Sequence, residues 1–330
     1  MLEQILVPLD GSMLATCVLP HTIALARTFN AHVTLLHTLE HDKTSSHSVD
    51  PLSWYLRKAE TQSYLDEVSG RLQQVGVPVD HVLLEGPAAT RITEYAHSHG
   101  TDLIVLSSHG QSGLSHWGIS SVAQKIVQRA NTSIMLVPAY QYSDSNQSAA
   151  QYRRILVPLD GSQRAESGLP LAAMLARYSQ AKLILAHVVS RPRLFRRLPP
   201  AAEDTRLVDQ LVERNLAEAA SYLEQLQSRL PVESETHLLT SDNVISTLHE
   251  LVEQHEIDLV MLSAHGYSIE VQQPYGGLAP NFVAYGSTPL LIKQDLLPQQ
   301  MKLSWAEAAA RTQEGASTRR KAGYTHAPSR

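Results

Sequence analysis

The sequence predicts an α/β protein that contains two tandem copies of one domain, each built on a parallel sheet with helices on both faces. Two observations predict this fold. Residues 5–12 read Ile-Leu-Val-Pro-Leu-Asp-Gly-Ser, and residues 155–162 repeat them letter for letter, which marks a duplicated unit. Within each copy, short apolar runs alternate with longer segments of 3.6-residue periodicity, a pattern typical of βαβ units.

A second repeated motif, the second echo of the duplication, aligns the later parts of the two copies. Residues 102–110, DLIVLSSHG, match residues 258–266, DLVMLSAHG, in the same order. The offset between the copies is larger here than at the first echo, so copy two carries a short insertion. We place it near 191–200, where proline and arginine interrupt any periodic pattern.

The expected elements follow from these patterns. In copy one we expect strands near 4–8, 32–38, 79–84, 102–107 and 133–137, and helices near 13–29, 52–74, 88–98 and 120–130. In copy two we expect strands near 154–158, 182–188, 233–238, 257–262 and 289–292, with helices between them. Most strands of copy one are nearly continuous apolar runs, as strands covered on both faces should be. Ser12 and Ser162 stand where a helix N-cap belongs, and the Asp-Gly pair before each favours a tight turn.

These patterns divide the chain. We assign residues 1–140 to domain 1, the polar segment 141–152 to a linker and residues 153–295 to domain 2. Residues 296–330 have no strand pattern and are expected to be a disordered tail, in which SWAEAAARTQ could form a short helix.

Composition and charge exclude several classes of protein. With 27 basic and 32 acidic side chains the formal net charge is −5, so nucleic acid is not expected as a partner. The single cysteine, Cys17, cannot form an intramolecular disulfide or a thiolate metal cluster, which fits a reducing compartment. No signal peptide pattern is present and no apolar run approaches the ~20 residues that span a bilayer. We therefore expect a cytoplasmic protein without a membrane span.

The ligand site of an open parallel sheet lies beyond the carboxyl ends of its strands, where the strand order reverses. Three loops converge there in each copy. The first presents Asp10 and Asp160, the second follows Thr38 and Val188, and the third follows the fourth strand. In copy one this third loop, SSHGQSGLSHWGISS at 107–121, runs into a helix N-terminus. Free backbone N–H groups and the helix dipole can hold an anion there, and phosphate is the natural candidate.

These residues resemble the universal stress protein family, in particular its tandem two-domain members. The resemblance covers residues 2–138 and 153–293. It rests on the repeated Val-Pro-Leu-Asp-Gly-Ser, on the Ser-His-Gly after the fourth strand and on the closing strand that ends Leu-Val-Pro138. It implies a five-stranded doubly wound sheet of order 3-2-1-4-5 in each copy. It also implies an intramolecular pseudo-dimer in which the fifth strands pair, as in single-domain members, and in many members an adenine nucleotide bound near the strand-one Asp.

The family's nucleotide loop, Gly-x2-Gly-x9-Gly-Ser, carries over to both copies only in part. Copy one keeps the final hydroxyl but has serine for both outer glycines, and copy two keeps the third glycine but loses the hydroxyl. Glu270 in the copy-two loop would repel a triphosphate if it faced the site. The resemblance therefore favours ATP, with or without Mg²⁺, in copy one. The loop positions are Ser107, Gly110, Ser120 and Ser121 in copy one and Ser263, Gly266, Gly276 and Gly277 in copy two.

Histidine and arginine clusters allow further interpretations. His109 and His265 could transfer protons, but we favour a role in holding the loop. A run of arginines after the second strand of copy two is either an anion contact or a solvated loop; it comprises Arg191, Arg193, Arg196 and Arg197. Other histidines fit no recognised zinc-ligand spacing and are interpreted as scattered surface residues, so no metal site and no catalytic residue is assigned. They are His37, His41, His47, His97 and His99.

Three functions remain open. The preferred one is a stress-response regulator that binds an adenine nucleotide in copy one, uses copy two as a structural partner and is at most a slow ATPase. The second is a scaffold that has lost nucleotide binding and recognises a protein or another small or lipid-like ligand. The third is a slow phosphohydrolase or phosphotransferase acting at Ser120 or Ser121. An efficient ATPase lacks support, because no paired carboxylates and no Gly-x4-Gly-Lys-Ser/Thr element accompany the loop. The sequence leaves open the stress served, the protein partners and a homodimer of the chain.

Overall fold

The computed structural model describes residues 2–40, 51–110, 119–139, 148–192, 202–267 and 274–295. Copy one comprises β1 (Gln4–Pro8), η1 (Leu14–Val18), α1 (Leu19–Phe29), β2 (His32–Leu39), α2 (Pro51–Gln74), β3 (Val79–Glu85), α3 (Ala88–Ser98), β4 (Leu103–Ser107), α4 (Ser121–Arg129) and β5 (Ser133–Val137). Copy two comprises β6 (Arg154–Pro158), α5 (Gln163–Glu166), α6 (Leu169–Ser179), β7 (Lys182–Val189), α7 (Ala202–Arg229), β8 (Ser234–Thr240), α8 (Val244–Gln254), β9 (Leu259–Ser263), α9 (Leu278–Tyr285) and β10 (Leu290–Lys293).

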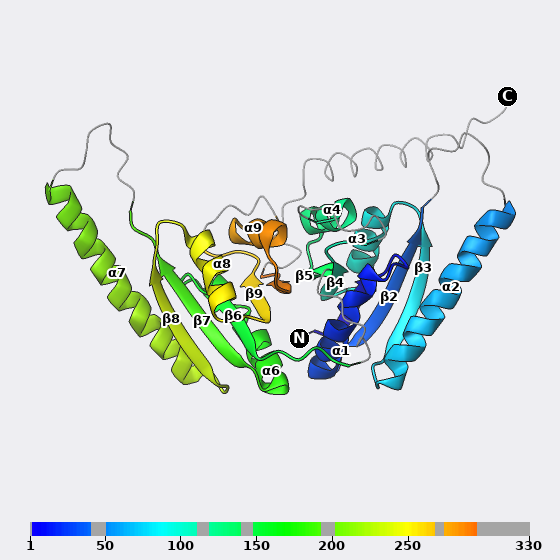
Figure 1. Cartoon of the computed structure of the whole chain (residues 1–330), viewed down its shortest axis with the longest axis horizontal. Coiled ribbons are helices and arrows are strands. Elements are labelled where there is room, and N and C mark those ends of the chain that lie inside the picture. Colours follow the sequence, from blue (N-terminus) through cyan, green and yellow to red (C-terminus); the bar gives the residue numbers. More distant parts are fainter. Residues whose placement is uncertain are drawn as a thin grey trace, which may run out of the picture.

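The strands of both copies form a single sheet. Its order is β3-β2-β1-β4-β5-β10-β9-β6-β7-β8, so each copy has the predicted order 3-2-1-4-5. All neighbouring strands are parallel except β5 and β10, which pair antiparallel with Met135 opposite Leu291. The two copies lie side by side, with α2 and α7 on the outer flanks and α1 against α6 near the middle (Figure 1). The fold class is confirmed, and the copies pair through their fifth strands as the resemblance implies.

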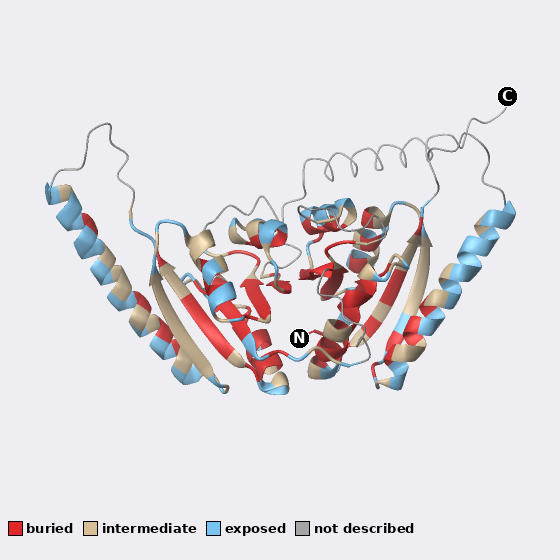
Figure 2. Ribbon diagram, in the orientation of Figure 1, coloured by how far each residue is buried: buried red, intermediate tan, exposed pale blue. Residues whose placement is uncertain are grey.

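Two apolar layers cover the opposite faces of this sheet. Because side chains alternate along a strand, Leu35 and Val7 join one layer while Leu36 and Leu6 join the other. Both layers contain residues of both copies. Figure 2 shows the buried residues along the strands and the exposed residues on the outer faces of α2 and α7. The core is therefore continuous across the junction between the copies.

The predicted helix 13–29 is interrupted. A 3-10 helix, η1, precedes α1, and copy two has the same break between α5 and α6. Pro20 is near the start of α1 and has no N–H, and its ring would clash with the carbonyl four residues earlier in a continuous helix. Ser162 is the N-cap of α5 as predicted, and its Oγ accepts from the Ala165 N–H at 3.1 Å. Ser12 Oγ accepts from the Ala15 N–H at 3.1 Å, but the N-cap residue of η1 is Met13.

The aspartates that open the second echo hold the opposite edge of the sheet. Asp102 Oδ2 accepts hydrogen bonds from the backbone N–H groups of Glu3 and Gln4 at 2.8 and 3.0 Å. Asp258 accepts the same pair of bonds in copy two, from residues 153 and 154, at 2.6 and 2.8 Å. This part of the repeated motif joins the first and fourth strands at their amino ends and is structural.

Only the end of the predicted linker is described. Ala150 N–H donates to the Pro20 carbonyl at 2.8 Å, and the buried Tyr152 hydroxyl lies 2.7 Å from His21 Nδ1. The domain limits stay a prediction. Several expectations fall outside the described residues: those on the tail 296–330, Glu270, Arg193, Arg196, Arg197, His41 and His47. Within the described ranges, no helix is long and apolar enough to cross a membrane.

Candidate functional site

Two predicted loops of copy one meet at Asp10 and Gly110. Asp10 follows β1, and its Oδ1 accepts hydrogen bonds from the Ser12 backbone N–H at 3.0 Å and from the Ser12 hydroxyl at 2.6 Å. The intervening Gly11 has a φ of +82°, which favours glycine. A Cβ atom on Gly110 would lie 1.9 Å from Asp10 Oδ2. Glycine is therefore needed at 110 because of the carboxylate that lies against it.

Copy two repeats this junction. Asp160 Oδ1 accepts from the Ser162 N–H at 3.0 Å, and its Oδ2 accepts from the Tyr267 N–H at 2.6 Å. A Cβ atom on Gly266 would lie 2.2 Å from the same Oδ2. Burial opposes ionisation of Asp160, but hydrogen bonds from Ser162 and from the Tyr267 backbone outweigh it, so the pKa of Asp160 is lowered. The carboxylate thus joins the loop after β6 to the loop after β9.

The serines that replace the first family glycine bond to neighbouring chain segments. Ser107 Oγ lies 3.2 Å from the Leu14 carbonyl oxygen and 2.5 Å from that of His109. Ser263 Oγ donates to the Ala165 carbonyl at 3.0 Å. These hydroxyls hold η1 and α5 against the fourth strand of each copy.

The start of the last helix differs between the copies. The Ser120 N–H donates to the Ser108 carbonyl at 2.7 Å, and the Gly276 N–H donates to the Ala264 carbonyl at 2.6 Å, so positions 120 and 276 are structurally equivalent. Ser120 Oγ caps α4 by accepting from the Ala123 N–H. The next residues are Ser121, an exposed first residue of α4, and Gly277, which precedes α9 without a side-chain cap.

His109 and His265 hold their loops through different partners. His109 Nδ1 lies 3.0 Å from Ser108 Oγ, which also accepts from the Ala139 N–H at 3.0 Å. In copy two alanine replaces this serine, and His265 Nδ1 instead lies 2.7 Å from Asp295 Oδ1. Both rings are buried, and burial lowers the pKa of His109. These contacts agree with the loop-holding interpretation.

Two polar groups beside Asp10 were missed by the sequence reasoning. His37 is half-buried rather than scattered on the surface, and its Nδ1 has no hydrogen-bond partner among the described residues. The buried hydroxyl of Tyr64, on α2, has none either. Burial lowers the pKa of His37 although Asp10 opposes the shift. Burial and then the charge of Asp10 raise the pKa of Tyr64 to about 12.

The same pair recurs in copy two. His187 Nδ1 is buried without a hydrogen-bond partner in the described part of the chain, and its ring lies 6.3 Å from that of Tyr222 between centroids in an edge-on arrangement. The Tyr222 hydroxyl, however, faces the carboxylate of Glu166. Burial lowers the pKa of His187, with Asp160 acting against it. The signal that could have found this pair is the repeat itself, since each copy places a His immediately before the predicted Thr38 or Val188.

Thr38 and Val188 are half-buried near the ends of β2 and β7, opposite Leu84 and Leu239. Because side chains alternate along a strand, Thr38 and His37 face opposite sides of the sheet. Among the described residues, Thr38 has no hydrogen bond to another predicted site residue. The structure therefore places Asp10 against Gly110 and points Thr38 to the side of the sheet opposite to His37.

Copy two carries additional charged side chains near Tyr222 and His265. Asp295 Oδ2 lies 3.8 Å from Arg164 Nε, and the charge of Glu166 contributes, after burial, to raising the pKa of Tyr222. In copy one the equivalent positions are uncharged and hold Leu14, Thr16 and Ala139.

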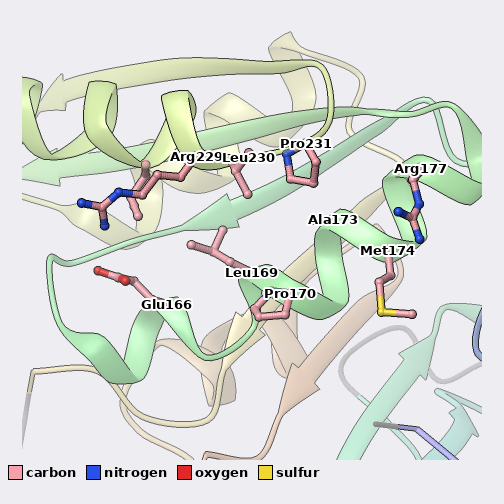
Figure 3. A pocket seen from close by; sticks show the side chains of 10 residues that line it. Glu166, Leu169, Pro170, Ala173, Met174, Arg177, Arg229, Leu230 and Pro231 are labelled. Carbon is pink, nitrogen blue, oxygen red and sulfur yellow. The ribbon is translucent and has the colours of Figure 1, made fainter.

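A groove of about 410 Å³ lies elsewhere, between α6 and the end of α7 (Figure 3). Leu169, Ala173 and Met174 line it from α6, and Leu230 and Pro231 line it from the far end of α7. None of the predicted site residues lines this groove, so the carboxyl edge of the sheet remains the candidate site.

The sequence model described as the universal stress protein family matches residues 1–138 and again residues 151–292. The chain belongs to the universal stress protein family. The universal stress protein MJ0531 of Methanocaldococcus jannaschii is 29% identical over 139 residues, which cover 41% of this chain and 81% of that protein. One universal stress protein domain of the tandem chain thus corresponds to one such relative.

Solved structures resemble the whole tandem arrangement. A universal stress protein from Archaeoglobus fulgidus aligns over 88% of this chain and 98% of its own, with 14% identity and a TM-score of 0.61. The functionally unknown protein PA1789 from Pseudomonas aeruginosa aligns over 96% and 98%, with 13% identity and a TM-score of 0.63. At this identity the likeness concerns the fold of the tandem universal stress protein.

Proposed function

We propose that this universal stress protein binds an adenine nucleotide at the carboxyl edge of the copy-one strands and acts as a regulator with at most slow hydrolysis. The observation that carries the proposal is a pair of buried atoms beside Asp10, His37 Nδ1 and the Tyr64 hydroxyl, which have no hydrogen-bond partner among the described residues. A buried polar atom without a partner costs about 1–3 kcal/mol. A ligand with hydrogen-bonding groups would supply the missing partners.

The protonation states of these groups suit a nucleoside. With its pKa lowered, the imidazole of His37 is neutral at neutral pH, so it carries one acceptor and one donor nitrogen. With its pKa near 12, Tyr64 keeps its hydroxyl proton and can donate. Base nitrogens and ribose hydroxyls match such neutral donors and acceptors.

The phosphate groups of a bound nucleotide would fit copy one better than copy two. The N-terminus of α4, at Ser121, offers free N–H groups and a favourable dipole for an anion such as the phosphates of ATP, with or without Mg²⁺. Copy two has Glu166 close to Tyr222 and Asp160, and this carboxylate would repel phosphate. The proposal therefore assigns the nucleotide to copy one.

The test removes one hydroxyl in each copy. Tyr64→Phe and the matched control Tyr222→Phe would be titrated with ATP and with AMP by calorimetry, with and without magnesium, using the full chain freed of nucleotide. We expect about one nucleotide per chain, and an affinity about tenfold weaker for Tyr64→Phe, equal to ~1.4 kcal/mol, with no change for Tyr222→Phe. The Tm of Tyr64→Phe should not fall, because the Tyr64 hydroxyl has no hydrogen-bond partner among the described residues. Equal affinities of both variants and the parent would reject the site.

A second candidate, a scaffold without nucleotide, is favoured by one observation. The hydroxyls of Ser107 and Ser120, which replace family glycines, are used within the protein and so offer less to a phosphate. A folded chain that gives no binding heat at millimolar ATP would favour this scaffold and turn the search to protein or lipid-like ligands.

A further inference from the structure

A cluster of metal-ligating side chains lies apart from Asp10, Asp160 and the loops around them. Glu235 and His237 are on β8, and His255 follows the end of α8. One possible ligand atom from each of the three lies within 4.8 Å of the other two. His237 Nε2 is 2.9 Å from Glu235 Oε1. The two imidazole rings are 4.4 Å apart between centroids, in an edge-on arrangement.

The fold explains how these residues meet. Glu235 and His237 are two positions apart on the edge strand, so both side chains point to the same face of the sheet. The helix α8 ends at Gln254, and His255 is its C-cap residue, shortly before the chain enters β9. Because Glu235 and His237 come from a strand and His255 from the end of a helix, their sequence spacing resembles no metal-binding motif.

We propose that Glu235, His237 and His255 bind a divalent transition-metal ion of the zinc class, which would connect the edge strand β8 to the end of α8. Two imidazoles and one carboxylate form a nitrogen and oxygen donor set that suits zinc and its neighbours rather than calcium or magnesium. Three protein ligands leave a further coordination position for water. The site is distinct from the nucleotide proposal and does not depend on it.

The surroundings prepare the carboxylate for this role. Lys182 Nζ lies 2.8 Å from Glu235 Oε2, which leaves Oε1 facing His237. Outer contacts of this kind orient a metal ligand. The side chain of His237 is only 16% exposed, which limits competition from bulk water.

Copy one provides an internal comparison. Strand registers make Val33 and Leu183 equivalent, and they pair with Val79 and Ser234 respectively. The positions that match the cluster in copy one are therefore Asp80, Val82 and His99.

Copy one lacks only the central ligand. Val82 packs against the apolar layer there, so the fold does not need an imidazole at this position. His237 replaces an apolar contact with a metal-ligating group in copy two alone. This difference favours a ligand role for His237 over a packing role.

The experiment titrates the chelator-treated full chain with Zn²⁺ by calorimetry and with Co²⁺ by visible absorption, which reports nitrogen and oxygen coordination. We expect one tight ion per chain and a higher Tm in its presence. His237→Val, which copies Val82, should weaken binding at least about 100-fold, since loss of an outer-shell partner alone costs 10–100-fold. His255→Asn should weaken binding as an independent variant. The matched control His99→Asn, in copy one, should bind as the parent does.

Three results would overturn the site. They are no binding of Zn²⁺ or Co²⁺ below millimolar concentration, parental affinity in both His237→Val and His255→Asn, and an equal loss in His99→Asn. Far-UV circular dichroism of each variant establishes that the fold is kept, and His255→Asn decides the outcome if His237→Val does not fold.

Discussion

The contact between Gly110 and Asp10 should make the effects of substituting these two residues on the free energy of unfolding non-additive. In Gly110→Ala the new Cβ would lie 1.9 Å from Asp10 Oδ2, so the carboxylate must move. It would then lose its hydrogen bonds from the Ser12 N–H and hydroxyl, now 3.0 and 2.6 Å long. Hydrogen bonds to charged groups contribute about 1.5–3 kcal/mol each. Because Asp10 is half-exposed we use the lower value, and the free energy of unfolding should fall by about 3 kcal/mol.

Urea unfolding of a double-mutant cycle checks this reasoning. Asp10→Ala alone should cost a similar amount, and adding Gly110→Ala to it should cost under about 0.5 kcal/mol, since the clashing carboxylate is gone. Gly70→Ala is the control. It lies in α2 with nothing within 4 Å of the new Cβ, and should stabilise the protein by up to about 1 kcal/mol. Additive costs for the Asp10 and Gly110 substitutions would refute the contact as the reason for glycine.

Two further predictions concern buried contacts in copy one. Ser108→Ala removes the bonds to His109 Nδ1 and to the Ala139 N–H, and should lower stability by about 2 kcal/mol in urea unfolding. Adding Ala139→Asp, which introduces the residue found at the equivalent position of copy two, should recover part of the lost stability. No recovery would contradict the structural equivalence of Ala139 and Asp295. Burial lowers the pKa of His21 to about 4, while the unfolded chain titrates near 6.5. The unfolded state therefore binds the extra proton between these values, and stability falls as pH drops from 6.5 to 4. His21→Gln, which also changes the contact with Tyr152, should reduce that slope by up to about 1.4 kcal/mol per pH unit, and an unchanged slope would reject this assignment.

Most of the fold could be predicted because the internal repeat and the hydrophobic periodicities indicate its strands and helices. The exact echo of Val-Pro-Leu-Asp-Gly-Ser aligns the copies, and apolar runs place the strands to within a few residues. The break before α1 was missed although its signal, Pro20, is in the sequence. The continuous amphipathic pattern of residues 13–29 favours a single helix. Pro20, however, is tolerated only in the first turn of a helix and therefore marks the start of a new one.

The site was less predictable because its details depend on distances between separate segments. The family pattern identified Asp10 and Gly110, but not that one excludes a side chain on the other. Sequence spacing groups His37 with the nearby His41 and His47. The more informative relation is to His187, which stands at the equivalent position of the other copy. Whether the Ser107 hydroxyl faces a ligand or the backbone of η1 is decided only by the folded chain.

The antiparallel pairing of β5 with β10 also affects how the protein can evolve. In a pair assembled from two identical chains, each mutation appears twice and alters both halves together. Here the two halves belong to one polypeptide, so a substitution changes one half only. The two halves are always present in equal numbers and need no association step. Copy two can carry His237 where copy one keeps Val82. The fused gene therefore lets each half of a nearly symmetric sheet acquire its own chemistry while the shared core stays unchanged.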